Sequence, residues 1–165
     1  MAPSTTCFHS SFEPADPQPL ATPTGADLAP GEDGMRCVVD SGPTHSPTAK
    51  VDVGFTGLRA LRYTGRHLGR GGAAFVRDLF EVDVEVTADT ELSYAIFPAF
   101  TPGDLTYPAT FAALDLRFDD GTHLSELDAT DQHGARMSAR GQGDSKTLST
   151  DQWNHKSVRI GSVAV

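Results

Sequence analysis

The sequence lacks long hydrophobic runs, and no stretch of roughly 18 or more apolar residues occurs in its 165 residues. This pattern predicts no membrane-spanning helix and no membrane partner. Basic side chains are also scarce, with 13 Lys and Arg against 22 Asp and Glu, and they do not cluster. The net charge of −9 repels a phosphate backbone, so nucleic acid is not an expected partner.

Cysteine is equally scarce, since the chain holds only Cys7 and Cys37. Two cysteines permit one disulfide but do not require it. Both lie in short β-like runs, so a bridge between neighbouring strands is geometrically conceivable. Two separate buried thiols fit the sequence equally well, and the sequence leaves this choice open.

Turn-forming residues are abundant, with 16 Gly and 11 Pro, and 38% of the residues are hydrophobic. This composition is too apolar for a disordered chain and favours many short strands. The length suits one domain. We therefore expect a disordered tail over residues 1–6 and a single module over 7–165, with a long surface loop at 14–34.

Hydrophobic alternation at period two predicts antiparallel strands and no helix. The clearest case is LFEVDVEVT, and a further strand, followed by the Asp119–Gly121 turn and THLSEL, predicts a hairpin. These features predict an all-β fold, an antiparallel, jelly-roll-like β-sandwich. The expected strands are 7–13, 36–40, 50–55, 57–65, 79–87, 92–100, 111–118 and one within 153–165.

Acidic residues are the first candidates for chemistry, because glycoside hydrolysis uses two carboxylates that face each other across a sugar. Asp119 and Asp120 are adjacent, but their place before Gly121 is typical of a hairpin turn. No histidine pattern with transition-metal spacing is present. We therefore expect no catalysis from this chain alone.

Calcium is the metal that best fits a chain rich in loop carboxylates, because hard cations take oxygen ligands. Glu13 ends the expected first strand, and Asp16 follows within the same turn. These two residues are the predicted metal ligands. The alternative is that Glu13 is an exposed acid at a strand end.

Carbohydrate binding needs an aromatic face together with polar groups for the hydroxyls. Tyr107 lies in a loop and is the expected exposed aromatic, while Trp153 is either a platform or a core residue. Asp131, His133 and Arg136 share one loop. That loop either holds a polar ligand or is a solvated turn built around its His-Gly pair.

Five segments of the chain resemble the N-terminal accessory region of actinobacterial exo-α-mannosidases of glycoside hydrolase family 92. They cover well over half of the sequence in the same order: 10–20, 53–67, 80–98, 107–127 and 142–165. The resemblance implies a galactose-binding-like or jelly-roll module placed before the catalytic domains of a secreted α-mannosidase. It also implies that Glu13, in the sequence Phe-Glu, contributes to a structural calcium. No catalytic residue of the family matches this chain.

The resemblance sets the functional expectation: a non-catalytic, carbohydrate-binding-like accessory module of a secreted α-mannosidase. Its expected partners are a mannose-containing glycan and the downstream catalytic domains. The alternative is a purely structural domain without a ligand. The chain carries no export signal, and it stops after SVAV where relatives continue, so we expect a sandwich that lacks its last strand. The sequence does not say which sugar is bound.

Overall fold

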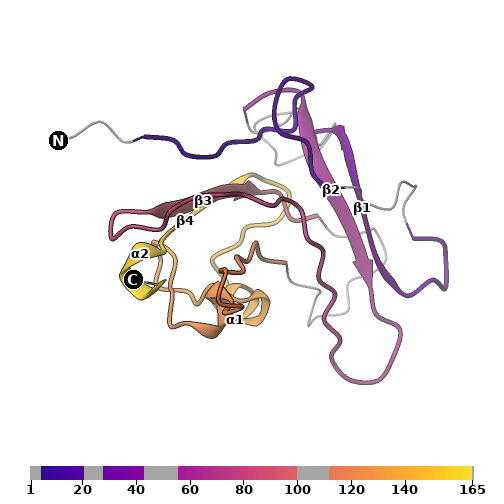
Figure 1. Cartoon of the computed structure of the whole chain (residues 1–165). Coiled ribbons are helices and arrows are strands. Elements are labelled where there is room, and N and C mark those ends of the chain that lie inside the picture. The colour runs from indigo at the N-terminus through magenta and orange to yellow at the C-terminus, as the bar shows by residue number, and fades with distance from the viewer. Residues whose placement is uncertain (1–4, 21–27, 43–55, 100–111, 165) are drawn as a thin grey trace. The chain divides into compact units, whose positions relative to one another are not determined.

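The computed structural model describes residues 5–20, 28–42, 56–99 and 112–164. The chain divides into two compact units, one of Met1–His45 with Val51–Val84 and one of Ser46–Lys50 with Glu85–Val165. Each unit contains one antiparallel pair of strands (Figure 1). The described helices are short, so the chain is of the all-β class. None of these helices has the length and hydrophobicity needed to cross a bilayer.

The first unit is built on the pair β1 (Gly34–Ser41) and β2 (Arg59–Arg66). Cys37 lies opposite Tyr63 in this antiparallel register. The strands predicted at 36–40 and 57–65 are thereby confirmed. The strand predicted at 50–55 lies outside the described residues.

The strand predicted at 7–13 is wrong, because the chain there makes local hydrogen bonds instead of a ladder. The Oδ2 atom of Asp16 accepts from the backbone nitrogen of Ser11 at 2.8 Å and from its hydroxyl at 2.5 Å. Phe12 adopts a φ of 62°, which no strand uses. Short polar side chains that capture backbone donors compete in this way with sheet formation. Phe8 and Phe12 still share a face, since their rings lie 5.0 and 6.0 Å from that of Phe80.

The strand predicted at 79–87 is also absent as a hydrogen-bonded strand. Its alternation appears only in part in the exposure of the side chains, since Val82 is exposed. Phe80, Val84 and Val86 are half-buried, and the acidic residues between them are exposed. A period of two specifies an extended backbone with two different faces, but a strand also needs a neighbour that completes its ladder.

The second unit is built on β3 (Glu91–Ile96) and β4 (Asn154–Arg159), which pair antiparallel with Glu91 opposite Arg159. These strands confirm the predictions within 92–100 and 153–165. The unit also contains η1 (Leu124–Glu126), α1 (Ala139–Asp144) and α2 (Gly161–Ala164). In Figure 1, α1 and the chain that leads to it lie on one side of the β3–β4 pair.

The core of the second unit lies between β4 and the 124–137 segment. Its buried residues are Leu124, Ala129, Met137, Val158 and Ile160. Leu92 and Tyr94 of β3 pack against this cluster. Tyr94 is half-buried against the cluster, and this burial raises the pKa of its hydroxyl to about 12.

The hairpin predicted around Asp119 and Asp120 forms, but it is short. Arg117 and His123 make a single antiparallel bridge, and Gly121 takes a φ of 88°. Hydrogen bonds from Thr122 to the Asp120 carboxylate lower the pKa of Asp120. The adjacent acids therefore belong to a turn, as predicted. The chain then enters η1 in place of the expected second strand.

The prediction that the chain holds no helix is wrong at α1 and α2. α1 begins after Ser138, whose hydroxyl accepts from the backbone nitrogen of Gly141 at 3.0 Å. Both helices are shorter than two turns, so no helical period shows in the sequence. α2 follows β4 directly and contains Val163, which had been expected to extend the strand.

Both cysteines are free thiols. Cys7 is exposed, while Cys37 is buried in β1, where burial raises the pKa of its thiol. The structure therefore fits neither alternative from the sequence: the two cysteines form no disulfide, and only one of the two thiols is buried.

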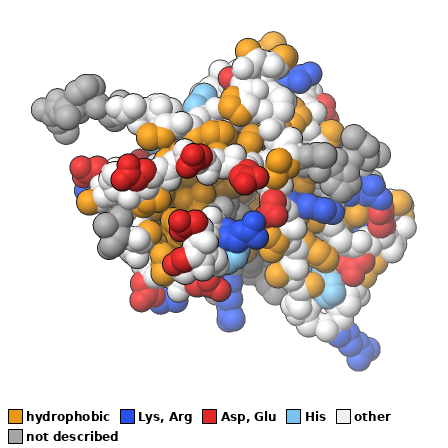
Figure 2. Space-filling model, viewed as in Figure 1, with side chains coloured by type: hydrophobic (Ala, Val, Ile, Leu, Met, Phe, Trp, Pro, Cys, Tyr) orange, Lys and Arg blue, Asp and Glu red, His pale blue; other side chains and the backbone are white. Residues whose placement is uncertain are grey.

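The first unit carries the large hydrophobic side chains that are exposed among the described residues. Figure 2 shows apolar side chains (orange) at the surface around the β1–β2 hairpin. These exposed residues are Phe8, Leu20, Leu58, Tyr63, Leu68, Phe75, Val76 and Val82. A two-stranded hairpin has too little area to bury such side chains by itself.

We predict that Gly161→Ala destabilises the chain, because a Cβ atom at this position would overlap the carbonyl oxygen of Thr87. Both Ile160 and Gly161 direct their backbone nitrogens to the carbonyl of Thr90, so the backbone cannot simply move away. The expected loss in free energy of unfolding is about 1–3 kcal/mol, measured by urea denaturation. The control is Gly72→Ala, where a Cβ meets no atom within 4 Å. Equal stability of the two variants would contradict the prediction.

Candidate functional site

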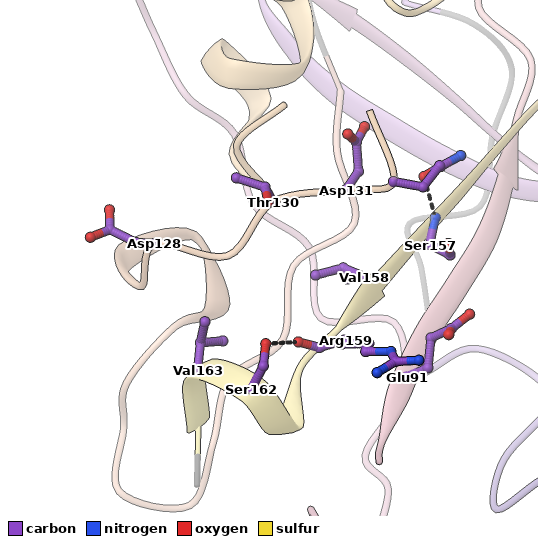
Figure 3. Close-up of a pocket in the computed structure, with 10 residues that line it drawn as sticks. Glu91, Asp128, Thr130, Asp131, Ser157, Val158, Arg159, Ser162 and Val163 are labelled. Atoms are coloured by element: carbon purple, nitrogen blue, oxygen red, sulfur yellow. Dashed lines mark hydrogen bonds between the residues drawn. The ribbon is translucent and has the colours of Figure 1, made fainter. Parts of the chain in front are cut away.

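An open groove of about 380 Å³ lies on the second unit, along β4 (Figure 3). Polar side chains dominate its lining. The lining residues come from the start of β3, the 128–132 segment, β4 and α2: Glu91, Asp128, Thr130, Asp131, Gln132, Ser157, Val158, Arg159, Ser162 and Val163.

One wall of the groove is fixed by Gln132, which binds the backbone of β4. Its backbone nitrogen donates to the carbonyl of Ser157 at 3.0 Å. Its side-chain oxygen accepts from the backbone nitrogen of Ser157 at 2.9 Å, and its side-chain nitrogen donates to the carbonyl of His155 at 2.7 Å. Gln132 thus occupies backbone groups on the side of β4 that faces away from β3.

Beneath this wall lies a buried ion pair between Asp131 and Lys156. The side chains are 0% and 1% exposed, and Lys156 Nζ lies 2.7 Å from Asp131 Oδ2. Lys156 also donates to the hydroxyl of Thr147 at 2.6 Å. Two buried charges are tolerated only when each has such close partners.

The carboxylate of Asp131 receives several further hydrogen bonds. Its Oδ1 atom accepts from the backbone nitrogens of His133 and Ala135, each at 2.9 Å, and its Oδ2 atom accepts from Gln142 at 3.2 Å. Burial by itself would raise the pKa of Asp131. The hydrogen bonds, above all that from Lys156, outweigh this effect and lower the pKa. Asp131 is therefore held as a carboxylate and its role is to organise the loop.

Four groove side chains retain free polar groups: the carboxylate of Glu91, the hydroxyls of Thr130 and Ser157, and the guanidinium of Arg159. Among the residues that the structure covers, these groups have no hydrogen-bond or ion-pair partner. They offer acceptors and donors to a ligand in the groove. The half-buried Val163 adds apolar surface, whereas Val158 is only 4% exposed and belongs to the core.

The residues predicted to bind carbohydrate are only partly brought together. Asp131 lines the groove, whereas His133 is exposed at the tip of a turn where Gly134 takes a φ of 79°. Arg136 forms an ion pair with Asp128, a groove residue. The loop is thus a turn around its His-Gly pair with His133 exposed, and the binding of a polar ligand by this loop stays a prediction.

One of the two predicted aromatic contacts, Trp153, lies within the described residues. Trp153 is half-buried and packs edge-to-face on Phe97, with ring centroids 5.5 Å apart. It does not line the groove. Tyr107 lies outside the described residues.

The predicted metal ligands of the first unit are engaged with the backbone. Glu13 Oε1 accepts from the backbone nitrogens of Leu58 and Arg59 at 2.7 and 2.9 Å. Asp16 accepts from Ser11, as described above, and these hydrogen bonds lower its pKa. Within the described ranges, no group of three His, Cys, Asp or Glu side chains could hold a metal ion. The second oxygen of Glu13 and nearby carbonyls are the atoms left for calcium, which stays a prediction.

A serine, a histidine and an aspartate also meet near the short hairpin, a combination that the sequence analysis did not identify. Asp115 Oδ2 accepts from the hydroxyl of Ser125 at 2.6 Å, and it lies 3.6 Å from His123 Nδ1. A catalytic triad requires the histidine between the serine and the acid. Here Asp115 is in the middle, so the arrangement does not activate the hydroxyl of Ser125.

The groove residues that sequence reasoning missed are Glu91, Asp128, Thr130, Gln132, Ser157, Arg159 and Ser162. They are spread over 72 positions, from 91 to 162, and meet only because β3 pairs with β4. One pattern indicates two of these residues: positions 157 and 159 alternate with the buried residues 156, 158 and 160, so they lie on the outer face of the strand. No protein-family model and no curated protein matches the chain.

We predict that Lys156→Met strongly destabilises the chain, because it leaves the Asp131 carboxylate buried without its counter-ion. The expected loss in free energy of unfolding is about 3–5 kcal/mol. Adding Asp131→Asn removes the remaining charge, so the double variant should lose less than the sum of the two single losses. The control is Arg136→Met, which breaks an exposed pair and should change stability little. Strict additivity in urea denaturation would refute the coupling.

We also predict that Glu13→Ala loosens the start of β2, because the amides of Leu58 and Arg59 lose their shared acceptor. In the presence of a chelator, hydrogen exchange of these two amides should quicken by roughly tenfold, the equivalent of one hydrogen bond to a charged group. Glu81→Ala, which removes an exposed acid of the same unit, serves as the control. Unchanged exchange at both amides would contradict this role of Glu13.

Proposed function

We propose that this chain is a non-catalytic accessory module that binds carbohydrate for a secreted α-mannosidase. The observation that carries the proposal is the groove along β4, with free polar groups from Glu91, Thr130, Ser157 and Arg159 beside the half-buried Val163. The family resemblance of five sequence segments supports the assignment to α-mannosidases. We further propose that the two antiparallel pairs belong to a jelly-roll or galactose-binding-like sandwich.

The chemistry of the groove suits a sugar. Each sugar hydroxyl both donates and accepts a hydrogen bond, and the free groups of the groove supply both functions. The C–H face of a pyranose needs apolar contact, which the half-buried side chain of Val163 offers. The groove is open, so the end of a longer glycan can reach it.

A purely structural role is the second candidate, and the exposed apolar side chains of the first unit favour it. Exposed apolar patches mark surfaces that another protein covers. In the parent enzyme, the downstream catalytic domains are the proposed partner of this surface. Such packing would need no ligand in the groove.

Calcium is proposed as a structural cofactor near Glu13, where the second carboxylate oxygen and neighbouring carbonyls are the donors. A metal that binds only the folded chain raises its melting temperature by mass action. The proposal assigns this ion no part in holding the sugar.

We predict that the chain retains mannose-containing glycans on a glycan array, and that it does so with or without calcium, because the groove and Glu13 belong to different units. Millimolar calcium added after chelation should raise the melting temperature in a parallel scan. Heat-denatured chain is the control for adhesion. Failure to retain any glycan, with the chain shown to be folded, would favour the purely structural role.

A further inference from the structure

The charged side chains of the groove indicate which class of sugar it binds. This inference rests on the proposed function. We infer that the groove selects neutral sugars and holds two adjacent hydroxyls between Glu91 and Arg159. No other charged side chain of the groove is uncommitted, since Asp131 pairs with Lys156 and Asp128 with Arg136.

The positions of Glu91 and Arg159 follow from the pairing of β3 with β4. The two residues are directly opposite in the antiparallel register, so their side chains leave the pair on the same face, with Cβ atoms about 4.5–5.5 Å apart. Figure 3 shows them as neighbours at the end of the groove. Within the described part of the chain, the two side chains form no ion pair with each other, so each keeps its hydrogen-bonding capacity.

The chemistry of this couple matches a vicinal diol. A carboxylate only accepts hydrogen bonds and a guanidinium only donates them. One hydroxyl of the diol donates to Glu91, and its neighbour accepts from Arg159. Hydrogen bonds to ionised groups are stronger than neutral ones, so this couple gives more affinity than two serines in its place.

The balance of charge also disfavours charged sugars. The carboxylate of a hexuronic acid would meet Glu91 as well as Arg159, and the ammonium of a hexosamine would meet Arg159 as well as Glu91. In either case the attraction to one of the two charges is offset by repulsion from the other, while the ligand loses part of its hydration. A neutral hexose avoids both costs.

The test titrates the folded 165-residue chain, labelled with ¹⁵N, with three methyl glycosides: that of mannose, that of glucuronic acid and that of glucosamine. The neutral mannoside should bind at least several-fold more tightly than either charged sugar, and it should shift the amide signals of Glu91 and Arg159. Glu91→Gln and Arg159→Gln should each weaken mannoside binding by roughly tenfold. Glu91→Gln also leaves one uncompensated positive charge, so its affinity for the glucuronide relative to the mannoside should rise.

Matched controls are Glu85→Gln and Arg117→Gln, which make the same changes at exposed positions of the same unit outside the groove. Their mannoside affinity should equal that of the parent chain. If a charged sugar binds more tightly, or if the groove variants bind mannoside as well as the controls do, the inference is wrong while carbohydrate binding stands. If none of the three sugars and no arrayed glycan binds the folded chain, the proposed function itself fails.

Discussion

The second unit depends on the buried ion pair between Lys156 and Asp131. Lys156 reaches inward from β4, and Asp131 begins the turn that leads toward α1. Through Gln142 of α1 and the hydroxyl of Thr147, the same pair connects the turn at Asp131, α1, the segment that follows α1, and β4. An apolar pair of the same size could fill this space, but it would not fix which oxygen faces which donor. The ion pair therefore sets the register of the loop on β4, and with it the wall of the groove.

Strands could be predicted where hydrophobic and polar residues alternate and a second condition holds. That condition is either a pairing strand nearby in sequence or a hydrophobic face that the rest of the unit buries. β1, β2, β3 and β4 satisfy this condition. The segment at 79–87 has the strongest alternation but no ladder, because alternation specifies two faces and not a neighbour. At 7–13, the carboxylate of Asp16 takes the donors of Ser11, a local competition that hydrophobicity does not report.

Less of the candidate site could be predicted from the sequence, because its prediction requires knowing which residues of β4 face the core and which face outward. Val158 and Ile160 are apolar positions of the strand expected within 153–165, and Lys156 shares their face. A lysine on the inward face of a strand requires a buried carboxylate, but the sequence does not say which of its 22 Asp and Glu residues supplies it. Ser157 and Arg159, on the other face, would then have emerged as the groove residues. Glu91 could not have been found without the register of β3 on β4.

The way Gln132 lies along β4 has a consequence for how copies of this chain meet one another. An uncovered strand edge is a template on which a second chain can add a strand, and many proteins aggregate by this route. Gln132 imitates a neighbouring strand with its backbone nitrogen and both ends of its amide, and so occupies the groups of Ser157 and His155 that a foreign strand would need. With Gln132 in place, these backbone groups of β4 bind the protein's own loop. Without it, they would be open to pairing with an extended peptide.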